Sequence, residues 1–232
     1  MNARNRRPYD NSRREASVRA TRRRVIEAAK DLFVSQGYPA TTLEAIGEAS
    51  GTPLPTLYRL FGSKRALLKA VLDTSFVGDD APVAFGDRPQ VQAALAEADP
   101  ESFIDAFAVI CREVKDRSCA IYRVLSTAAL VDVEAAELLA DVRQQAHKGR
   151  SRIVATLKRM DALDPALSRR EAEDIVYTCL SFEVAWILTS ERGWNGRQYE
   201  AWIARSLRAL LRPDRRWGHP PTARASEEAS CC

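Results

Sequence analysis

The chain has 232 residues, of which 46% are hydrophobic and 28% charged, and this excludes an intrinsically disordered protein. Only 10 glycines interrupt a sequence rich in alanine, leucine, arginine and glutamate, a mixture that favours helices. The net charge is +4, yet residues 1–24 hold nine arginines and two acidic residues, so positive charge gathers at the N-terminal end.

Membrane, metal and enzyme classes are disfavoured as well. No apolar run is long enough to span a bilayer, and the N-terminus lacks the apolar core of a signal peptide, so we expect a cytoplasmic protein without a membrane partner. The five cysteines and two histidines lack the spacing of a zinc site, and no nucleophile–base set or phosphate loop occurs. We therefore expect no metal, no cofactor and no enzymatic activity.

The first elements in chain order are a basic arm and a helix. Residues 1–16 are rich in arginine, asparagine and serine with few apolar side chains, which predicts a disordered arm. A helix is expected from near Ser17 to Gly37, because apolar residues recur there at helical spacing. A basic arm by itself is as typical of a solvated tail as of a nucleic-acid contact.

Residues 42–61 have the pattern of two short helices joined by a tight turn at Gly51. Thr41 and Glu44 have the spacing of a capping box, which predicts the start of the first of these helices. The second is expected over residues 53–60, with Thr52 as its N-cap and a proline at its first position.

A further helix is expected over residues 63–77, with Ser63 as its N-cap. The basic step Ser63-Lys64-Arg65 at its start follows the helix–turn–helix directly. In proteins with this arrangement the second helix enters the major groove of DNA while its flanks contact phosphates.

The rest of the sequence predicts an all-α chain. Glycine, proline and aspartate over residues 78–89 indicate a loop and the domain boundary. Apolar residues at intervals of three or four predict further helices over 91–98, 100–116, 120–131, 134–160, 168–191 and 198–211. The composition of residues 212–232 predicts a disordered tail. We expect a helix–turn–helix domain over 19–79 and a larger helical domain over 90–211.

Short motifs occur in a fixed order near the N-terminus. They are RRRVIEAA at 22–29, LF at 32–33, GY at 37–38, ATT at 40–42, a glycine at 51, TLY at 56–58, and SK at 63–64 followed by two leucines at 67–68. Each motif is weak alone, but in this order and spacing they are specific. Residues 20–77 resemble the DNA-binding domain of the TetR family of transcriptional regulators. The remaining chain resembles the family in pattern, which implies an all-helical ligand-binding and dimerisation domain.

The resemblance also implies contacts with double-stranded DNA. It places Thr42, Thr52, Pro53, Thr56, Tyr58, Arg59 and Lys64 at the duplex. Thr56 and Arg59 occupy base-reading positions, where an arginine can pair bidentately with guanine, and the others contact or approach phosphates. The alternative for Arg59 is a solvated surface arginine. The chain departs from the family at Pro55, where a glycine is usual, and at Leu60.

The C-terminal half offers fewer signals. The run over residues 175–188 is apolar on nearly every face, so it is either a central core helix of a monomer or a helix shared with a partner subunit. The family's homodimer favours the second reading, with interface candidates Phe182, Trp186, Trp202 and Leu207. Residues that either line an effector pocket or form plain core are Phe103, Phe107, Ile110, Tyr122, Leu125 and Tyr177. Few charged residues interrupt these stripes, which suggests an apolar effector.

These observations predict a ligand-responsive, homodimeric transcriptional repressor that binds a palindromic operator. The alternative is an architectural or cell-division DNA-binding factor of the same fold that does not regulate transcription. No motif in the sequence supports an enzymatic activity.

Overall fold

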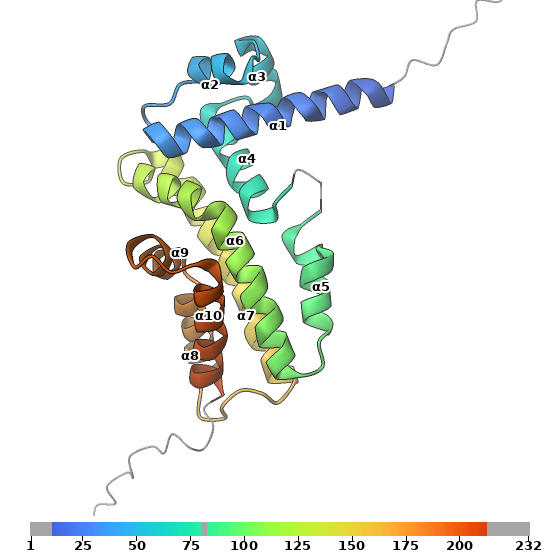
Figure 1. Cartoon of the computed structure of the whole chain (residues 1–232), viewed down its shortest axis with the longest axis vertical. Helices are drawn as coiled ribbons and strands as arrows, with labels where there is room; N and C mark the ends of the chain where they lie inside the picture. Colours follow the sequence, from blue (N-terminus) through green and yellow to red (C-terminus); the bar gives the residue numbers. More distant parts are fainter. Residues whose placement is uncertain (1–10, 80–82, 213–232) are drawn as a thin grey trace, which may run out of the picture.

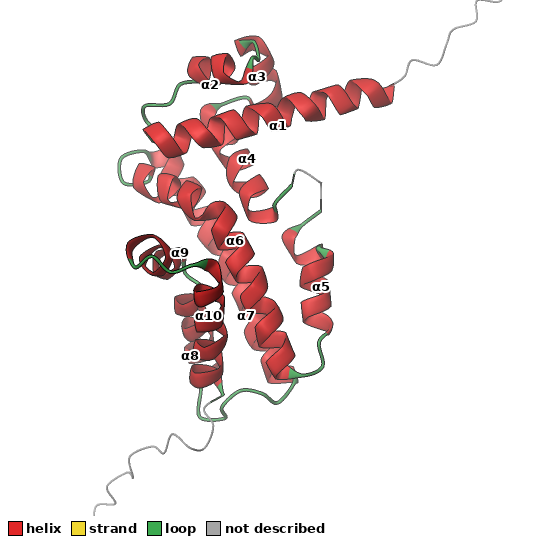
Figure 2. Cartoon of the chain, viewed as in Figure 1, coloured by secondary structure: helices red, strands yellow, loops and turns green. Residues whose placement is uncertain are grey.

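The computed structural model describes residues 11–79 and 83–212, and within these ranges every regular element is helical (Figures 1 and 2). The α-helices are α1 (Asn11–Gln36), α2 (Leu43–Ser50), α3 (Leu54–Phe61), α4 (Lys64–Val77), α5 (Pro89–Ala96), α6 (Pro100–Ala128), α7 (Val133–Arg159), α8 (Arg169–Cys179), α9 (Phe182–Trp186) and α10 (Gly196–Leu211). A 3₁₀ turn, Phe85–Asp87, precedes α5, and a π-helical turn, Ile187–Glu191, follows α9. The all-α prediction is confirmed.

Helices α1 to α3 form one end of the molecule, and α5 to α8 and α10 form the elongated remainder (Figure 1). Helix α4 leads from one part to the other and packs against both α1 and α6. The first hydrophobic cluster contains residues of all four helices from α1 to α4, together with residues from the adjoining parts of α6 and α7. The second cluster fills the space between α6, α7, α8 and α10. Through the first cluster, α6 packs directly against α1 and α4 of the N-terminal part.

Helix α1 begins at Asn11, so the prediction that residues 11–16 are disordered is wrong. Arginine, alanine and glutamate are strong helix formers, and Glu15 and Arg19 lie one turn apart with a carboxylate–guanidinium distance of 3.9 Å. The scarcity of apolar residues in this segment therefore does not prevent it from being helical. Residues 1–10 and 213–232 lie outside the described residues, and so does nearly all of the predicted C-terminal tail.

Helix α6 runs without interruption through residues 117–119, where two helices were expected. The buried Ser118 hydroxyl donates a hydrogen bond to the carbonyl of Val114, 2.5 Å away, and so needs no break in the helix to find a partner. The single 29-residue helix spans both hydrophobic clusters.

The single helix expected over 168–191 is instead divided into α8, α9 and the π-helical turn. The break lies at Leu180 and Ser181. The Ser181 hydroxyl caps α9 by accepting a hydrogen bond from the amide of Val184, 3.1 Å away. The guanidinium of Arg150 on α7 donates to the carbonyl of Leu180, 3.2 Å away. Polar partners at both sides of the break therefore replace the helical hydrogen bonds.

Among the described residues, no helix is both long and apolar enough to cross a membrane.

Candidate nucleic-acid interface and effector cavity

Helices α2 and α3 meet at a tight turn that requires glycine at two positions. Gly51 has a φ of +61°, in the left-handed region where L side chains are strained. A Cβ on Gly47 would lie 3.0 Å from the carbonyl oxygen of Thr52 and 3.4 Å from the side chain of Leu57. The two helices therefore approach closely enough to act as one rigid unit.

Helix α2 is capped by Thr42, not by Thr41. The Thr42 hydroxyl accepts a hydrogen bond from the amide of Ala45, 3.1 Å away. The buried Thr41 hydroxyl donates to the carbonyl of Gly37, 2.8 Å away, so it does not cap the helix and the predicted box with Glu44 does not form. Thr42 itself is exposed at the N-terminus of α2, where a helix attracts anions.

Helix α3 presents part of the predicted DNA-binding set to solvent. The Leu57 side chain is 1% exposed and anchors the helix in the first cluster, while Tyr58 is 51% exposed and Arg59 also points to solvent. Among the residues that the structure describes, Arg59 has no ion pair or hydrogen-bonding partner. Thr56, the other predicted base-reading residue, is half-buried. This helix therefore carries an unpaired cation and an aromatic phenol on its outer face.

The predicted contact Thr52 is 4% exposed, and its hydroxyl donates to the carbonyl of Ser50. Its side chain is a buried part of the turn and is neither a helix cap nor a surface for DNA. Helix α3 starts at Leu54 with Pro53 at the capping position and no side-chain cap. The helix begins one residue later than expected, at Leu54, even though this residue precedes Pro55. Pro53 remains exposed at the turn.

Two cations from neighbouring helices hold this unit in place. The Lys64 ammonium at the start of α4 donates to the carbonyls of Tyr38 and Thr41, each 3.0 Å away, and lies 4.5 Å from the centre of the Tyr38 ring. The Arg22 guanidinium of α1 lies 4.7 Å from the centre of the Phe61 ring at the end of α3. Lys64 thus fixes the loop that ends at the cap of α2, a role in addition to the predicted phosphate contact.

We expect Lys64→Met to lower the free energy of unfolding by about 1–3 kcal/mol, because two carbonyls lose a charged donor. Urea unfolding without DNA measures this change. Lys69→Met is the matched control, since Lys69 is an exposed α4 lysine that pairs with Asp73 one turn away. Equal stability of the two variants would contradict the role of Lys64 in holding the loop.

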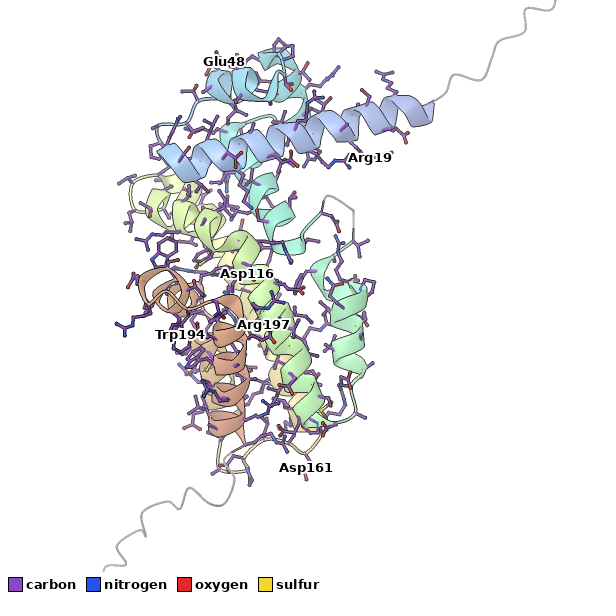
Figure 3. All side chains as sticks on the ribbon, in the orientation of Figure 1. Arg19, Glu48, Asp116, Asp161, Trp194 and Arg197 are labelled. Carbon is purple, nitrogen blue, oxygen red and sulfur yellow. The ribbon has the colours of Figure 1, made fainter. Side chains whose placement is uncertain are left out.

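Exposed arginines continue the positive surface along α1. Arg14, Arg19, Arg23 and Arg24 are exposed. Figure 3 shows Arg19 on the part of α1 that projects past the bundle, whereas Glu48 lies on α2. The cationic surface therefore extends from the helix–turn–helix toward the N-terminus, as expected for a protein that neutralises phosphates.

A small cavity lies between α6, α7, α8 and α9, with about 10 Å³ of free volume. Its walls are Tyr122, Val142, Arg143, Ala146, Arg150, Tyr177, Phe182 and Glu183. Of the predicted pocket residues, only Tyr122 and Tyr177 line this cavity. Phe103, Phe107, Ile110 and Leu125 are at most 7% exposed and fill the two hydrophobic clusters instead. For those four the plain-core alternative is correct.

Two of the predicted dimer-interface residues are buried within one chain. Leu207 is fully buried, and Phe182 is 7% exposed with its ring stacked on Tyr122 at a centroid distance of 4.1 Å. Neither side chain is open to a partner, because each faces the core of its own subunit. Trp186 and Trp202 are half-buried and retain exposed surface.

The residue that sequence reasoning missed is Lys115, on α6. Its side chain lies in the interior with 5% of its surface exposed, and its ammonium is 3.1 Å from the centre of the Phe182 ring. Burial is the main cause that lowers the pKa of this ammonium from 10.5 to about 7. The Arg150 cation acts in the same direction, whereas Cys111, Cys119 and Glu183 favour the charged form and oppose the shift. The sequence signal was the spacing of Lys115 from the apolar-face residues Ser118 and Tyr122, three and seven positions later.

Comparison with known proteins agrees with this architecture. The family described as "Bacterial regulatory proteins, tetR family" matches residues 25–71. The HTH-type transcriptional repressor ComR of Escherichia coli is 37% identical over 75 residues, which are 31% of this chain and 36% of ComR. An uncharacterized HTH-type transcriptional regulator, TtgW of Pseudomonas putida, is 40% identical over 57 residues, 25% of this chain and 42% of TtgW. The chain thus spans less than half the length of these curated relatives.

Solved structures extend the likeness to most of the fold. The fatty acid degradation regulator FadR from Bacillus halodurans has a TM-score of 0.60 at 17% identity, covering 82% of this chain and 94% of FadR. NalD, the secondary repressor of the MexAB-OprM multidrug efflux pump in Pseudomonas aeruginosa, has a TM-score of 0.59 at 19% identity, covering 84% and 98%. Together with the matching N-terminal motifs, these findings show that residues 25–71 form a DNA-binding domain of the TetR family, and that the chain as a whole shares the fold of these solved regulators.

Proposed function

We propose that the protein is a homodimeric repressor that binds a palindromic operator through α3 and releases it when a small-molecule effector binds. The observation that carries the proposal is the outer face of α3, where Arg59 and Tyr58 stand exposed on a helix anchored by Leu57. Two-fold symmetry supports the match to a palindrome, because a dimer places two such helices one helical turn of DNA apart, about 34–36 Å.

The proposed DNA contacts are Thr42, Pro53, Thr56, Tyr58 and Arg59, with Lys64 positioning the loop before α2. We place the DNA-binding domain over residues 19–79 and the effector-binding and dimerisation domain over 90–211. Trp186 and Trp202 are the remaining interface candidates. In this proposal the protein works in the cytoplasm, and it acts by binding DNA rather than by catalysing a reaction.

Contacts around α4 support a response to ligand. The ring of Phe76 on α4 lies 5.6 Å from the ring of Phe182, which lines the cavity. The Arg117 guanidinium of α6 donates to the carbonyls of Ser75 and Phe76 at the end of α4, and Lys30 of α1 donates to the Arg117 carbonyl, 3.0 Å away. A ligand that favours another position of Phe182 would shift α4 and so change the separation of the two α3 helices.

Transcription in vitro tests this function. A template carrying the protein's own binding site across a promoter should lose transcript as protein is added, and a scrambled site should not. An increase in transcript would make the protein an activator, and an unchanged level on both templates would refute a regulatory role.

The N-terminal arm contributes phosphate contacts in this proposal. Deleting residues 1–10 removes three arginines and leaves α1 complete. We expect the slope of log affinity against log salt to become shallower, by about 0.9 for each phosphate that the arm neutralises in the full chain. Deleting residues 213–232, which also hold three arginines, is the matched control. Equal slopes for the full chain and both deletions would make the arm a solvated tail.

A further inference from the structure

Lys115 is a buried cation without an anionic partner. It lies within α6 with 5% of its surface exposed, and no hydrogen bond from its ammonium to any described residue is present. Removing a charged amine from water without a partner is costly, and a protein interior normally supplies a carboxylate or a set of acceptors. Here the close contact is an aromatic ring, that of Phe182. No carboxylate of the described residues lies within ion-pair distance of this ammonium, although Glu183 is near enough to favour its charged form.

The Phe182 side chain contacts both this ammonium and the cavity, which places the ammonium close to the cavity wall. Tyr122 stacks on Phe182 with an interplanar angle of 16°, so no room remains for an ammonium on that face of the ring. Lys115 must contact the opposite face, and both Phe182 and Tyr122 line the cavity. A rotation of the Phe182 side chain would open the cavity to Lys115.

The cavity walls carry excess positive charge. Arg143 and Arg150 line it together with a single carboxylate, Glu183. Glu183 lies 3.8 Å from Arg143, and both side chains are more than half exposed. Arg150 is held by the Leu180 carbonyl and by the face of the Tyr177 ring, 4.5 Å away. Lys115 adds a third cation to this region whenever its amine is protonated.

We propose that this cavity, opened by movement of Phe182, binds a small amphipathic carboxylate, with the carboxylate on Lys115 and the apolar body between Tyr122 and Tyr177. The inference rests on the proposed function, since this ligand is the effector that the function requires. It also replaces the wholly apolar effector suggested by the sequence.

The energetics of Lys115 agree with an incoming anion. Burial holds the pKa of the ammonium near 7, so much of the amine is neutral at pH 8. A carboxylate beside it favours the charged form, and binding therefore takes up a proton from solvent. The free volume of about 10 Å³ means that the ligand enters by displacing Phe182, and the displaced ring is the one that contacts Phe76 of α4.

Calorimetric titration of the full chain at pH 8 tests the proposal. The probes are benzoate, 1-naphthoate and decanoate, each compared with its uncharged primary amide, in two buffers of different ionisation enthalpy. We expect at least one acid to bind about tenfold or more tightly than its amide, the contribution of a charge-assisted hydrogen bond, with uptake of a proton. Lys115→Met should remove this preference and the proton uptake. Lys158→Met, at an exposed α7 lysine, should retain both.

Two results would overturn the proposal. One is that every acid and its amide bind within about twofold of each other, or fail to bind, in the unaltered protein. The other is an acid preference that persists in Lys115→Met. The titration contains no DNA, so a protein that binds its operator but none of the acids refutes the carboxylate site alone. A protein that binds an acid but no DNA refutes the proposed function alone.

Discussion

Replacing Arg59 with alanine is expected to weaken specific operator binding by about 30-fold or more, since each bidentate arginine–guanine pair contributes about 1–3 kcal/mol and a dimer makes two. The exposed guanidinium of Arg59 has no protein partner among the described residues, so its removal leaves the fold intact. The loss should be concentrated at one base pair of each half-site, where the variant becomes tolerant of substitution. Fluorescence anisotropy with the operator and with single-base variants measures both effects.

The control for this substitution is Arg170→Ala on α8, which removes the same charge from a side chain that is 93% exposed and lies outside the helix–turn–helix. It should keep operator affinity within about twofold, since a distant solvent-exposed charge is largely screened. If Arg59→Ala behaves like Arg170→Ala, Arg59 is a solvated surface arginine and the base-reading role is refuted.

Replacing Lys115 with methionine is expected to stabilise the protein most at neutral pH and progressively less as the pH rises. The folded-state pKa of Lys115, about 7, lies below the unfolded value near 10.5, so the unfolded chain binds more protons between these limits. The stability of the unaltered protein therefore rises with pH in this window, by about 2–3 kcal/mol from pH 7 to pH 9 on account of this group. The methionine variant lacks that contribution.

Urea unfolding of both proteins at pH 7, 8 and 9 gives the difference directly. The advantage of Lys115→Met should be largest at pH 7 and shrink toward pH 9, and Lys158→Met should show no such trend. A constant difference across the three pH values would show that Lys115 has an ordinary pKa and is not desolvated in solution.

The helix–turn–helix could be predicted well because its signals are local. Gly51, Ser63 and the apolar spacing around Leu57 act within a few residues of where they stand, so the positions of α2, α3 and α4 followed within a residue or two. The family assignment rested on the same stretch. Which of two adjacent threonines caps α2 was beyond local reasoning, because Thr41 is occupied by carbonyls of the α1 helix end.

The C-terminal half was harder, because its structure depends on long-range partners. The break between α8 and α9 is stabilised by Arg150, which is 30 residues away in the sequence. The burial of Phe182 depends on Tyr122 and Phe76, which come from two other helices. An apolar stripe shows that a face is buried, but not whether its own chain or another molecule covers it, so Phe182 and Leu207 were wrongly placed at an interface.

Selection of bound DNA from a random-sequence duplex pool tests most directly whether α3 reads an operator. After repeated rounds with the full chain, we expect enrichment of a palindrome whose half-sites are centred about one helical turn, 34–36 Å, apart. The same selection with Arg59→Ala should give a consensus that has lost one base pair from each half-site. Enrichment of no consensus, with binding spread evenly over the pool, would contradict operator reading by α3 and favour an architectural DNA-binding factor.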